Sequence, residues 1–492
     1  MSQKVAVSVV FVAAMFMSIM DVTIVNVALP SIGRDFGVSP TAVDAISISF
    51  LVSLAIFIPA SGWLGDRFGG KRVLLAAIAV FTGASALCGI ASSLGELVAF
   101  RVLQGVGGGM LAPVGLAMLY RAFPPEERVR ASAILTVPTT LAPALGPVVG
   151  GLLVTDLSWR WVFYVNVPIG VTAFIFGSLA LAHDPQAAPG RFDLVGFLLS
   201  GLGLGLLMYG VSEGPVTGWS SGPVLGTIAV GAALLVAMVK VELATEEPIV
   251  ALRLLGNRLF RSTNVVMVLI SVGFLGTLYA VSLYYQDGRG LSALQSGLST
   301  FPEAIGVMMG AQLASRLIYP RLGPRRHISA GLVGASASMA LLALMGANTS
   351  LWWARLLMFS LGLFMAQVFV PTQAASFATI SPAAMGRAST MFNALRQLGG
   401  AVGVAMLTTA IVMVGPTRHQ AGHVVANLAS YHAAFVVAAV FGLAAVAAAL
   451  TIKDADAART MQPRRRRTAQ ADARPLALDE ATEPAEAAAA LG

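Results

Sequence analysis

Charged residues are scarce in this chain of 492 residues. Only 11% of its positions are Asp, Glu, Lys or Arg, whereas 57% are hydrophobic and the mean hydropathy is +0.81. An ordinary soluble domain carries about 25% charged residues, so this chain has too few to cover a water-facing surface. The composition therefore excludes a series of soluble domains joined by polar linkers. It indicates a protein that crosses a membrane many times.

The chain also lacks the groups that bond-making chemistry needs. Its one cysteine, Cys88, excludes a disulfide framework and a cysteine-based metal site. The glycine run 107–109 lacks the Lys-Ser/Thr of a nucleotide-binding loop, which argues against ATP-driven transport. His419 and His423 are four residues apart, but no acidic residue joins them, so we expect no metal site. No catalytic cluster is present, and we expect neither an enzyme nor a cofactor.

Long apolar runs dominate what the chain does contain. A helix needs about 20 apolar residues to cross the hydrocarbon layer, and we identify fourteen such runs. The first run is too long for a signal-peptide core, so we expect it to remain in the protein. The predicted spans are 5–29, 43–64, 73–92, 97–120, 131–154, 162–182, 193–213, 223–243, 260–284, 295–316, 328–347, 351–374, 389–414 and 432–452.

The basic residues between these runs are unevenly distributed. If both termini lie inside, the inner loops and ends hold 24 of the 31 Lys and Arg residues, and the outer loops hold four. Cytoplasmic loops of membrane proteins carry such an excess of positive charge. The distribution predicts cytoplasmic termini in a multi-pass protein of the cell membrane, and it argues against nucleic-acid binding.

The chain contains an internal repeat. Residues 67–72 follow the second span, and a similar basic stretch at 321–326 follows the tenth, at an offset of 254. The same offset relates Arg101 to Arg355, and both are expected within spans. Repeated membrane halves are typical of secondary transporters. The predicted domains are a six-helix bundle at 1–183, two inserted helices at 184–258, a second six-helix bundle at 259–452 and a disordered cytoplasmic tail at 453–492.

Five stretches resemble motifs of one transporter family, the major facilitator superfamily. They are residues 21–30, 62–72, 101–105, 146–151 and 159–168. Together they resemble its branch of fourteen-helix drug:proton antiporters. The resemblance implies an all-α membrane fold of two six-helix halves plus two inserted helices, and proton-coupled export of drugs. The chain departs from symmetry at Pro320, which the repeat places where the first half has Asp66.

Three charged residues within the spans are candidates for proton and substrate coupling. Asp21 lies in the first span, Arg101 in the fourth at a similar depth, and Glu303 in the tenth near the middle of the bilayer. An acid inside a membrane is functional by default, and Asp21 or Glu303 could exchange a proton for a cationic substrate. The alternatives are a structural ion pair for Asp21, an arginine that extends to the surface for Arg101 and a hydrogen-bonded acid for Glu303.

Three further charged residues are weaker candidates. Asp44 lies near the predicted outer mouth, where a solvated acid is the simpler interpretation. Arg355 is the repeat counterpart of Arg101 and has less neighbouring support. Arg396 lies in the thirteenth span and could neutralise either an acid or a substrate.

Two stretches, 62–72 and 146–151, are predicted to control alternating access. In the first, small residues allow close helix packing, and Asp66 can face a helix N-terminus and pair with an arginine. The second carries glycines and a proline that suit a kinked, rocking helix. The alternatives are a loop that only orients the chain and a helix that is only tightly packed. The predicted gating loop comprises Gly62, Asp66, Arg67, Gly69, Lys71 and Arg72, and the predicted antiporter kink comprises Gly146, Pro147, Gly150 and Gly151.

The resemblance and the charged residues together predict an antiporter. We expect it to export amphipathic, often cationic drugs in exchange for protons, by alternating access. Its expected partners are these small substrates and the lipid bilayer, and we expect the monomer to be functional. One alternative is a dedicated exporter of a single metabolite or of a self-made antibiotic. Another is a membrane receptor or scaffold, against which the internal repeat argues.

Overall fold

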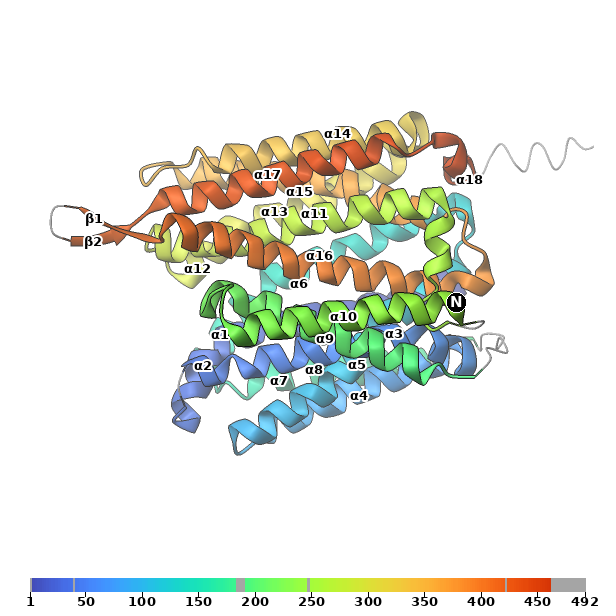
Figure 1. Cartoon of the computed structure of the whole chain (residues 1–492), viewed down its shortest axis with the longest axis horizontal. Coiled ribbons are helices and arrows are strands. Elements are labelled where there is room, and N and C mark those ends of the chain that lie inside the picture. Colours follow the sequence, from blue (N-terminus) through green and yellow to red (C-terminus); the bar gives the residue numbers. More distant parts are fainter. Residues whose placement is uncertain (1, 39, 183–190, 246–247, 421–422, 462–492) are drawn as a thin grey trace, which may run out of the picture.

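The computed structural model describes residues 2–38, 40–182, 191–245, 248–420 and 423–461. Long helices run side by side through the molecule, and a two-stranded hairpin extends beyond them at one end (Figure 1). This architecture follows from the apolar composition, because a backbone in hydrocarbon must satisfy its own polar groups and a helix does so within one segment.

The first half contains the helices that precede residue 183. They are α1 (Gln3–Phe36), α2 (Pro40–Val43), α3 (Ala45–Phe68), α4 (Gly70–Ile90), α5 (Leu94–Ala122), η1 (Pro125–Glu127), α6 (Arg128–Asp156), α7 (Trp161–Tyr164) and α8 (Asn166–Ala180). Two long helices, α9 (Leu194–Thr217) and α10 (Gly222–Ala244), and the short η2 (Leu252–Gly256) follow as an insertion.

The second half contains the remaining elements. Its helices are α11 (Arg258–Leu283), η3 (Tyr284–Gly288), α12 (Ala293–Thr300), α13 (Pro302–Leu313), η4 (Ala314–Ile318), α14 (Tyr319–Leu342), α15 (Leu351–Ser376), η5 (Pro382–Ala384), α16 (Met385–Val414) and α17 (Leu428–Leu450). Strands β1 (Thr417–Gln420) and β2 (His423–Ala426) pair antiparallel between α16 and α17, with Thr417 opposite Ala426. The short helices η6 (Asp454–Ala457) and α18 (Ala458–Met461) follow α17.

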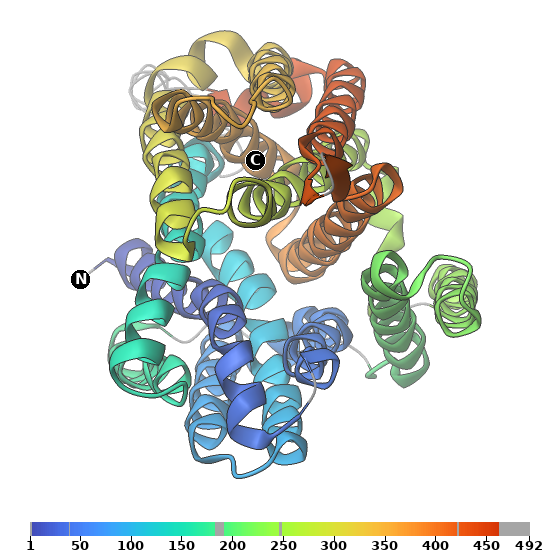
Figure 2. The same cartoon turned by 90° about the vertical axis from the view of Figure 1, so that its left-hand side faces the viewer.

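Corresponding helices pack in the same way in both halves. In the first half, α1 packs on α6 and α8, α3 on α5, and α4 on α5 and α8. In the second half, α11 packs on α16 and α17, α13 on α15, and α14 on α15 and α17. Figure 2 shows the two bundles facing each other, with α9 and α10 at one side. The packing thus follows the internal repeat, although the predicted boundary at residue 183 lies outside the described residues.

Eleven of the described helices are long and apolar enough to cross a membrane. Three of the predicted spans, 131–154, 295–316 and 328–347, are not among these eleven. The described residues of α6 contain the shorter apolar segment Leu141–Asp156. Helix α12 ends at Thr300 before α13 begins at Pro302, and α14 ends at Leu342, before the end of the predicted span. The fold is therefore an all-helical, multi-pass membrane fold, and the count of fourteen spans stays a prediction.

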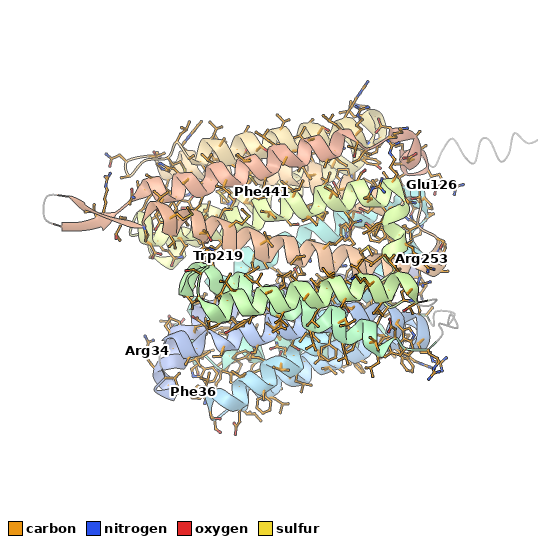
Figure 3. All side chains as sticks on the ribbon, viewed as in Figure 1. Arg34, Phe36, Glu126, Trp219, Arg253 and Phe441 are labelled. Atoms are coloured by element: carbon orange, nitrogen blue, oxygen red, sulfur yellow. The ribbon has the colours of Figure 1, made fainter. Side chains whose placement is uncertain are left out.

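The side surface of the bundle is apolar, as a lipid-facing surface must be. On α10, Leu225, Val230 and Val236 are each more than half exposed. Charged side chains gather at the ends: Figure 3 shows Arg34 at the hairpin end and Glu126 and Arg253 at the opposite end. We call the latter the inner end, because it carries the basic loops that the sequence analysis places inside.

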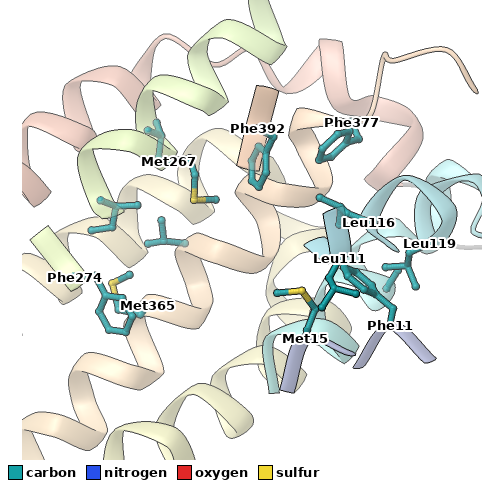
Figure 4. Close-up of a cluster of buried hydrophobic side chains, with 14 of the residues drawn as sticks. Phe11, Met15, Leu111, Leu116, Leu119, Met267, Phe274, Met365, Phe377 and Phe392 are labelled. Atoms are coloured by element: carbon teal, nitrogen blue, oxygen red, sulfur yellow. The ribbon is translucent and has the colours of Figure 1, made fainter. Parts of the chain in front are cut away.

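Apolar side chains fill the interior of both halves. Phe11, Met15 and Leu111 pack together in the first half, whereas Met267 and Met365 belong to the second (Figure 4). Burial of such side chains supplies a tightly packed frame. The few polar groups inside this frame are therefore held in fixed positions.

The predicted disorder of the tail does not begin at Lys453. Residues 454–461 form η6 and α18, and Ala457 and Thr460 are buried. The Tyr319 hydroxyl lies 2.7 Å from that of Thr460, and Asp454 accepts a hydrogen bond from the backbone N–H of Arg325 at 2.8 Å. These contacts explain why the segment is folded against the second half. Residues 462–492 lie outside the described part of the chain.

Candidate functional site

A buried ion pair joins two of the predicted coupling residues. Arg101 Nη1 on α5 lies 2.5 Å from Asp21 Oδ2 on α1, and both side chains are almost completely buried. The structure therefore brings Asp21 and Arg101 together at the depth that their positions in the sequence suggested. Charges removed from water in this way are tolerated only when they are paired and hydrogen-bonded.

Further polar groups complete this pair. Asp21 Oδ1 accepts hydrogen bonds from Gln104 Nε2 at 2.9 Å and from Asn166 Nδ2 at 2.8 Å. Arg101 donates to Gln104 Oε1 at 2.6 Å and to the backbone carbonyl of Ile46 at 3.2 Å. Both oxygens of Asp21 thus have donors. In this conformation the carboxylate is part of a closed network and is not exposed to a passing substrate.

The sequence analysis missed the roles of Gln104 and Asn166. Both lie within the stretches 101–105 and 159–168, and both are uncharged polar residues in otherwise apolar helices. Phe50 is a third missed member, since the Arg101 guanidinium lies 4.2 Å from its ring centroid. Polar residues buried in a membrane need partners, and this requirement was the available signal.

Glu303 lies in the first turn of α13, directly after Pro302, and is far from fully paired. Its side chain is 4% exposed, and its Oε1 atom has no hydrogen-bond partner among the described residues. A Cβ on Gly362 of α15 would overlap the backbone carbonyl of Glu303, so α13 and α15 approach very closely here. The structure does not join Glu303 to the Asp21–Arg101 pair by any contact between described residues.

The three weaker candidates lie apart from this pair. Asp44 is exposed at the start of α3. The Arg355 guanidinium lies 4.9 Å from the ring centroid of Trp352, and its Nε is buried without a partner in the described chain. Arg396 is half-buried on α16, and no hydrogen bond or ion pair links it to a residue that the structure describes.

Asp66 of the predicted gating loop lies at the contact between the halves. It pairs with Arg121 of α5, with a distance of 2.7 Å between Arg121 Nη2 and Asp66 Oδ1. A Cβ on Gly386, in the first turn of α16, would lie 3.0 Å from the same oxygen. Asp66 therefore faces the N-terminus of a helix from the opposite half, where the helix dipole favours a negative charge.

Gly62 lies where α3 closely approaches α16. A Cβ at this position would lie 2.7 Å from Thr390 Oγ1 and 3.2 Å from the backbone of Gly386. The neighbouring hydroxyls of Ser61 and Thr390 are 3.1 Å apart. A glycine is required at position 62 for this contact between the halves.

The other residues of the predicted gating loop make no such contact. Arg67 and Arg72 are exposed, and Gly69 has a φ of 87°, which suits the turn between α3 and α4. Lys71 donates to the backbone carbonyls of Ser178 and Leu181, both in the first half. The described contacts thus divide the loop: Gly62 and Asp66 face the second half, and the remaining members stay on the first.

Two arginines outside the predicted set also bridge the halves. Arg121 Nε donates to the carbonyl of Pro382 at 3.3 Å, and Arg128 Nη1 donates to the carbonyl of Phe377. Ser389 donates to the carbonyl of Pro113 at 2.6 Å. We call this set the inner latch: Ser61, Gly62, Asp66, Pro113, Arg121, Arg128, Phe377, Pro382, Gly386, Ser389 and Thr390. It joins the two halves at the inner end of the molecule.

The predicted antiporter kink packs within its own half. A Cβ on Gly146 would overlap Thr23 Oγ1 of α1, and a Cβ on Gly150 would lie 2.9 Å from Ile24 Cγ1. Gly151 has open space beside it, and the side chain of Pro147 lies outside the described part of the structure. The glycines thus bring α6 against α1, which is the tight-packing alternative.

The loop that follows α13 confirms the asymmetry expected from Pro320. In the first half the carboxylate beside the basic loop comes from Asp66 at the end of α3. In the second half Asp454 supplies one from the segment after α17, and a Cβ on Gly323 would lie 2.9 Å from its carboxyl carbon. The two loops are therefore held by acids from different parts of the chain.

Comparison with solved structures shows that the arrangement of helices is a known one. The human organic anion transporter MFSD10 superposes with a TM-score of 0.65, at 17% identity, covering 91% of this chain and all of that one. The proton:xylose symporter XylE gives a TM-score of 0.60 at 16% identity, over 90% of this chain and 94% of that one. These likenesses show the fold.

Comparison with other sequences identifies relatives. The multidrug resistance protein B homolog of Mycobacterium tuberculosis is 33% identical over 404 residues, 81% of this chain and 74% of that protein. The multidrug transporter MdtP of Bacillus subtilis is 31% identical over 80% of this chain and 73% of its own. The putative multidrug resistance protein MdtD of Serratia proteamaculans is 30% identical over 91% of this chain and 93% of that protein.

The family assignment rests on the length of these matches. The model of the Major Facilitator Superfamily matches residues 11–404, which is most of the chain. The relatives are transporters, so this chain is a membrane transporter and not an enzyme. The chain belongs to the major facilitator superfamily, in the branch of its multidrug resistance transporters.

Proposed function

We propose that this protein exports amphipathic, often cationic drugs in exchange for protons. The drug substrates are inferred from the multidrug transporters among its relatives. The observation that carries proton exchange is Glu303, an acid in the helical bundle whose Oε1 is buried and has no partner in the described chain. Burial disfavours the charged form of such a group unless a cation approaches. A proton and a cationic substrate can therefore compete for it.

In this proposal Asp21 and Arg101 form the second proton-responsive group. Protonation of Asp21 would remove one charge of the pair and loosen its bonds to Arg101, Gln104 and Asn166. These residues come from α1, α5 and α8, so the change would alter how three helices of the first half pack. Arg101 thereby tunes Asp21, while Asp44, Arg355 and Arg396 remain secondary candidates.

The inner latch supplies the gate. Its contacts hold the inner ends of the halves together, which corresponds to a transporter closed toward the inside. Opening requires the pair of Asp66 and Arg121 to leave Gly386 and Pro382. Exchange between this state and one closed at the hairpin end constitutes alternating access.

The remaining features of the proposal come from the sequence. We propose fourteen spans in the cell membrane, cytoplasmic termini and a functional monomer, with the domain boundaries at 183, 258 and 452. Protons are the coupling ion, and no cofactor takes part. The positive charge of the inner loops supports the orientation.

Efflux of a fluorescent cationic dye from loaded cells tests the proposal. We expect the native protein to expel the dye, a proton uncoupler to stop it, and Glu303→Gln and Asp21→Asn each to abolish active efflux. Asp156→Asn is the matched control, because Asp156 is exposed at the end of α6 and the change should leave efflux unchanged. Each variant is first shown to be folded by its melting temperature.

Three results would change the conclusion. Efflux that persists with the uncoupler would refute proton coupling. Efflux by Glu303→Gln under a proton gradient would remove Glu303 from the mechanism. If no dye moves under any gradient, a dedicated exporter of one metabolite or self-made antibiotic becomes the better proposal.

A further inference from the structure

Two carboxylates face each other at the inner end of the inserted helices. Asp193 is the N-cap residue of α9, and Glu242 lies near the end of α10. Gly196 lies between them: a Cβ there would overlap Asp193 Oδ2 and lie 2.6 Å from Glu242 Oε1. The absence of a side chain at Gly196 leaves the gap across which the two acids meet.

Each acid has one oxygen that is bonded and one that is not. Asp193 Oδ1 accepts from the backbone N–H of Gly196 at 2.8 Å, and Glu242 Oε1 accepts from that of Val250 at 3.0 Å. Asp193 Oδ2 and Glu242 Oε2 are buried and have no partner among the described residues. The Glu242 side chain is only 1% exposed. Leaving such atoms unpaired is costly.

No described basic group compensates the two acids. Arg253 of η2 donates instead to the carbonyl of Leu243, and Glu246 and Glu247 lie outside the described chain. Helices α3 and α16 also pack against α9. The charged residues at this end of the neighbouring segments are Asp66, Arg67, Arg191, Lys240, Arg253 and Arg387, and no described bond joins any of them to either acid.

We propose that Asp193 and Glu242 bind one proton between them. A protonated carboxyl on one residue donates to an oxygen of the other across the gap at Gly196. The proton also removes one of two like charges, as in other carboxylate pairs that share a proton. A divalent metal suits the site less well, because it takes about six oxygen ligands and only two unpartnered oxygens are present, both closed to solvent.

This proton site is separate from the proposed transport chemistry. Glu242 also bonds Val250 in the linker that leads to the second half. Loss of the proton would place two negative charges side by side and weaken the packing of this linker against α9 and α10. The site therefore makes the attachment of the inserted helices depend on the pH at the inner end.

The melting temperature of the purified full chain, measured from about pH 6 to about pH 9, tests the proposal. The folded protein holds a proton that the unfolded chain has lost at these pH values, so native stability should fall as the pH rises. Glu242→Gln and Asp193→Asn should each flatten this dependence. Glu213→Gln, at the other end of α9, is the matched control and should keep the native slope.

Infrared difference spectra of the same proteins give a direct readout. The carbonyl stretch of one protonated carboxylic acid should be lost in Glu242→Gln and in Asp193→Asn, but not in Glu213→Gln. If Glu242→Gln does not fold, Asp193→Asn carries the test. Unchanged spectra and unchanged pH slopes in a folded variant would overturn the proposal. A Mg²⁺ or Mn²⁺ stabilisation that the native protein shows and Asp193→Asn lacks would assign the site to a metal instead.

Discussion

At the scale of single residues, the Asp21–Arg101 pair is a buried ion pair held by further hydrogen bonds. Its carboxylate accepts bonds from three side chains, and its guanidinium also stacks on Phe50. Removing one member of a buried ion pair leaves the other charge without compensation, which costs more than removing both. The pair can therefore be tested for stability and for coupling in separate experiments.

We predict that Asp21→Asn destabilises the protein and that adding Arg101→Gln restores part of the loss. The single change leaves the Arg101 charge uncompensated and should cost about 3–5 kcal/mol. The double variant removes both charges and should be more stable than the single one, while still failing to couple efflux to protons. The measurement is the melting temperature with parallel dye efflux. A double variant less stable than Asp21→Asn would contradict the prediction.

The sequence allowed the depth of a residue in the membrane to be predicted, but it said less about the direction in which its side chain points. Helix rise converts residue number into depth, which is how Asp21 and Arg101 could be placed near each other. Gln104 and Asn166 could not be assigned, because helices that are apolar on all sides do not reveal which face points inward. The contacts of Arg121 and Arg128 with the second half were missed because their acceptors there are backbone carbonyls, and no local pattern marks such acceptors.

At the scale of the element, glycines decide which helices approach each other. Gly146 and Gly150 bring α6 against α1, and Gly399 and Gly403 bring α16 against α11 in the same manner. A Cβ on Gly403 would overlap the carbonyl of Val272. In both halves, therefore, the fifth long helix rests on the first through positions without side chains. The glycines of 146–151 thus have a packing role within their own half.

We predict that Gly146→Ala destabilises the chain and that Gly151→Ala does not. The first change places a methyl group against Thr23 and should cost about 1–3 kcal/mol through overpacking. The second meets open space. The melting temperatures of the two variants make the comparison. Equal tolerance of both changes would show that α1 and α6 are not held in the described contact.

The elements that the sequence predicted least well are those whose position depends on contacts with residues far away in the chain. The start of the tail is an example: Ala, Asp and Arg in 453–461 resemble a disordered segment, yet Thr460 and Asp454 find partners on α14. Local composition contains no information about that docking surface. The long apolar helices, in contrast, were predicted from their own residues.

At the scale of the whole molecule, the inner latch joins the halves through few bonds. The hydroxyls of Ser61 and Thr390 are 3.1 Å apart, and each belongs to a different half. The native chain has a single cysteine, Cys88, which is buried. A pair of introduced cysteines can therefore be crosslinked without interference from an accessible native thiol.

We predict that crosslinking Ser61→Cys to Thr390→Cys stops transport. A short thiol-reactive crosslinker would hold the inner ends closed, and a reducible one would allow dye efflux to recover after reduction. Each single cysteine variant serves as a control and should remain active. Continued efflux by fully crosslinked protein would mean that the inner latch does not need to open.

The two sides of the inner latch should differ in how well they tolerate substitution. Arg121 and Arg128 donate to the backbone carbonyls of Pro382 and Phe377, and every residue type offers the same carbonyl. Phe377 itself is buried in the core, but residues 381–383 are exposed. Substitutions at 381–383 should therefore be tolerated, whereas Arg121 and Arg128 should tolerate almost none. A saturation library selected for growth in a toxic substrate should record this contrast as one permissive stretch facing two invariant positions.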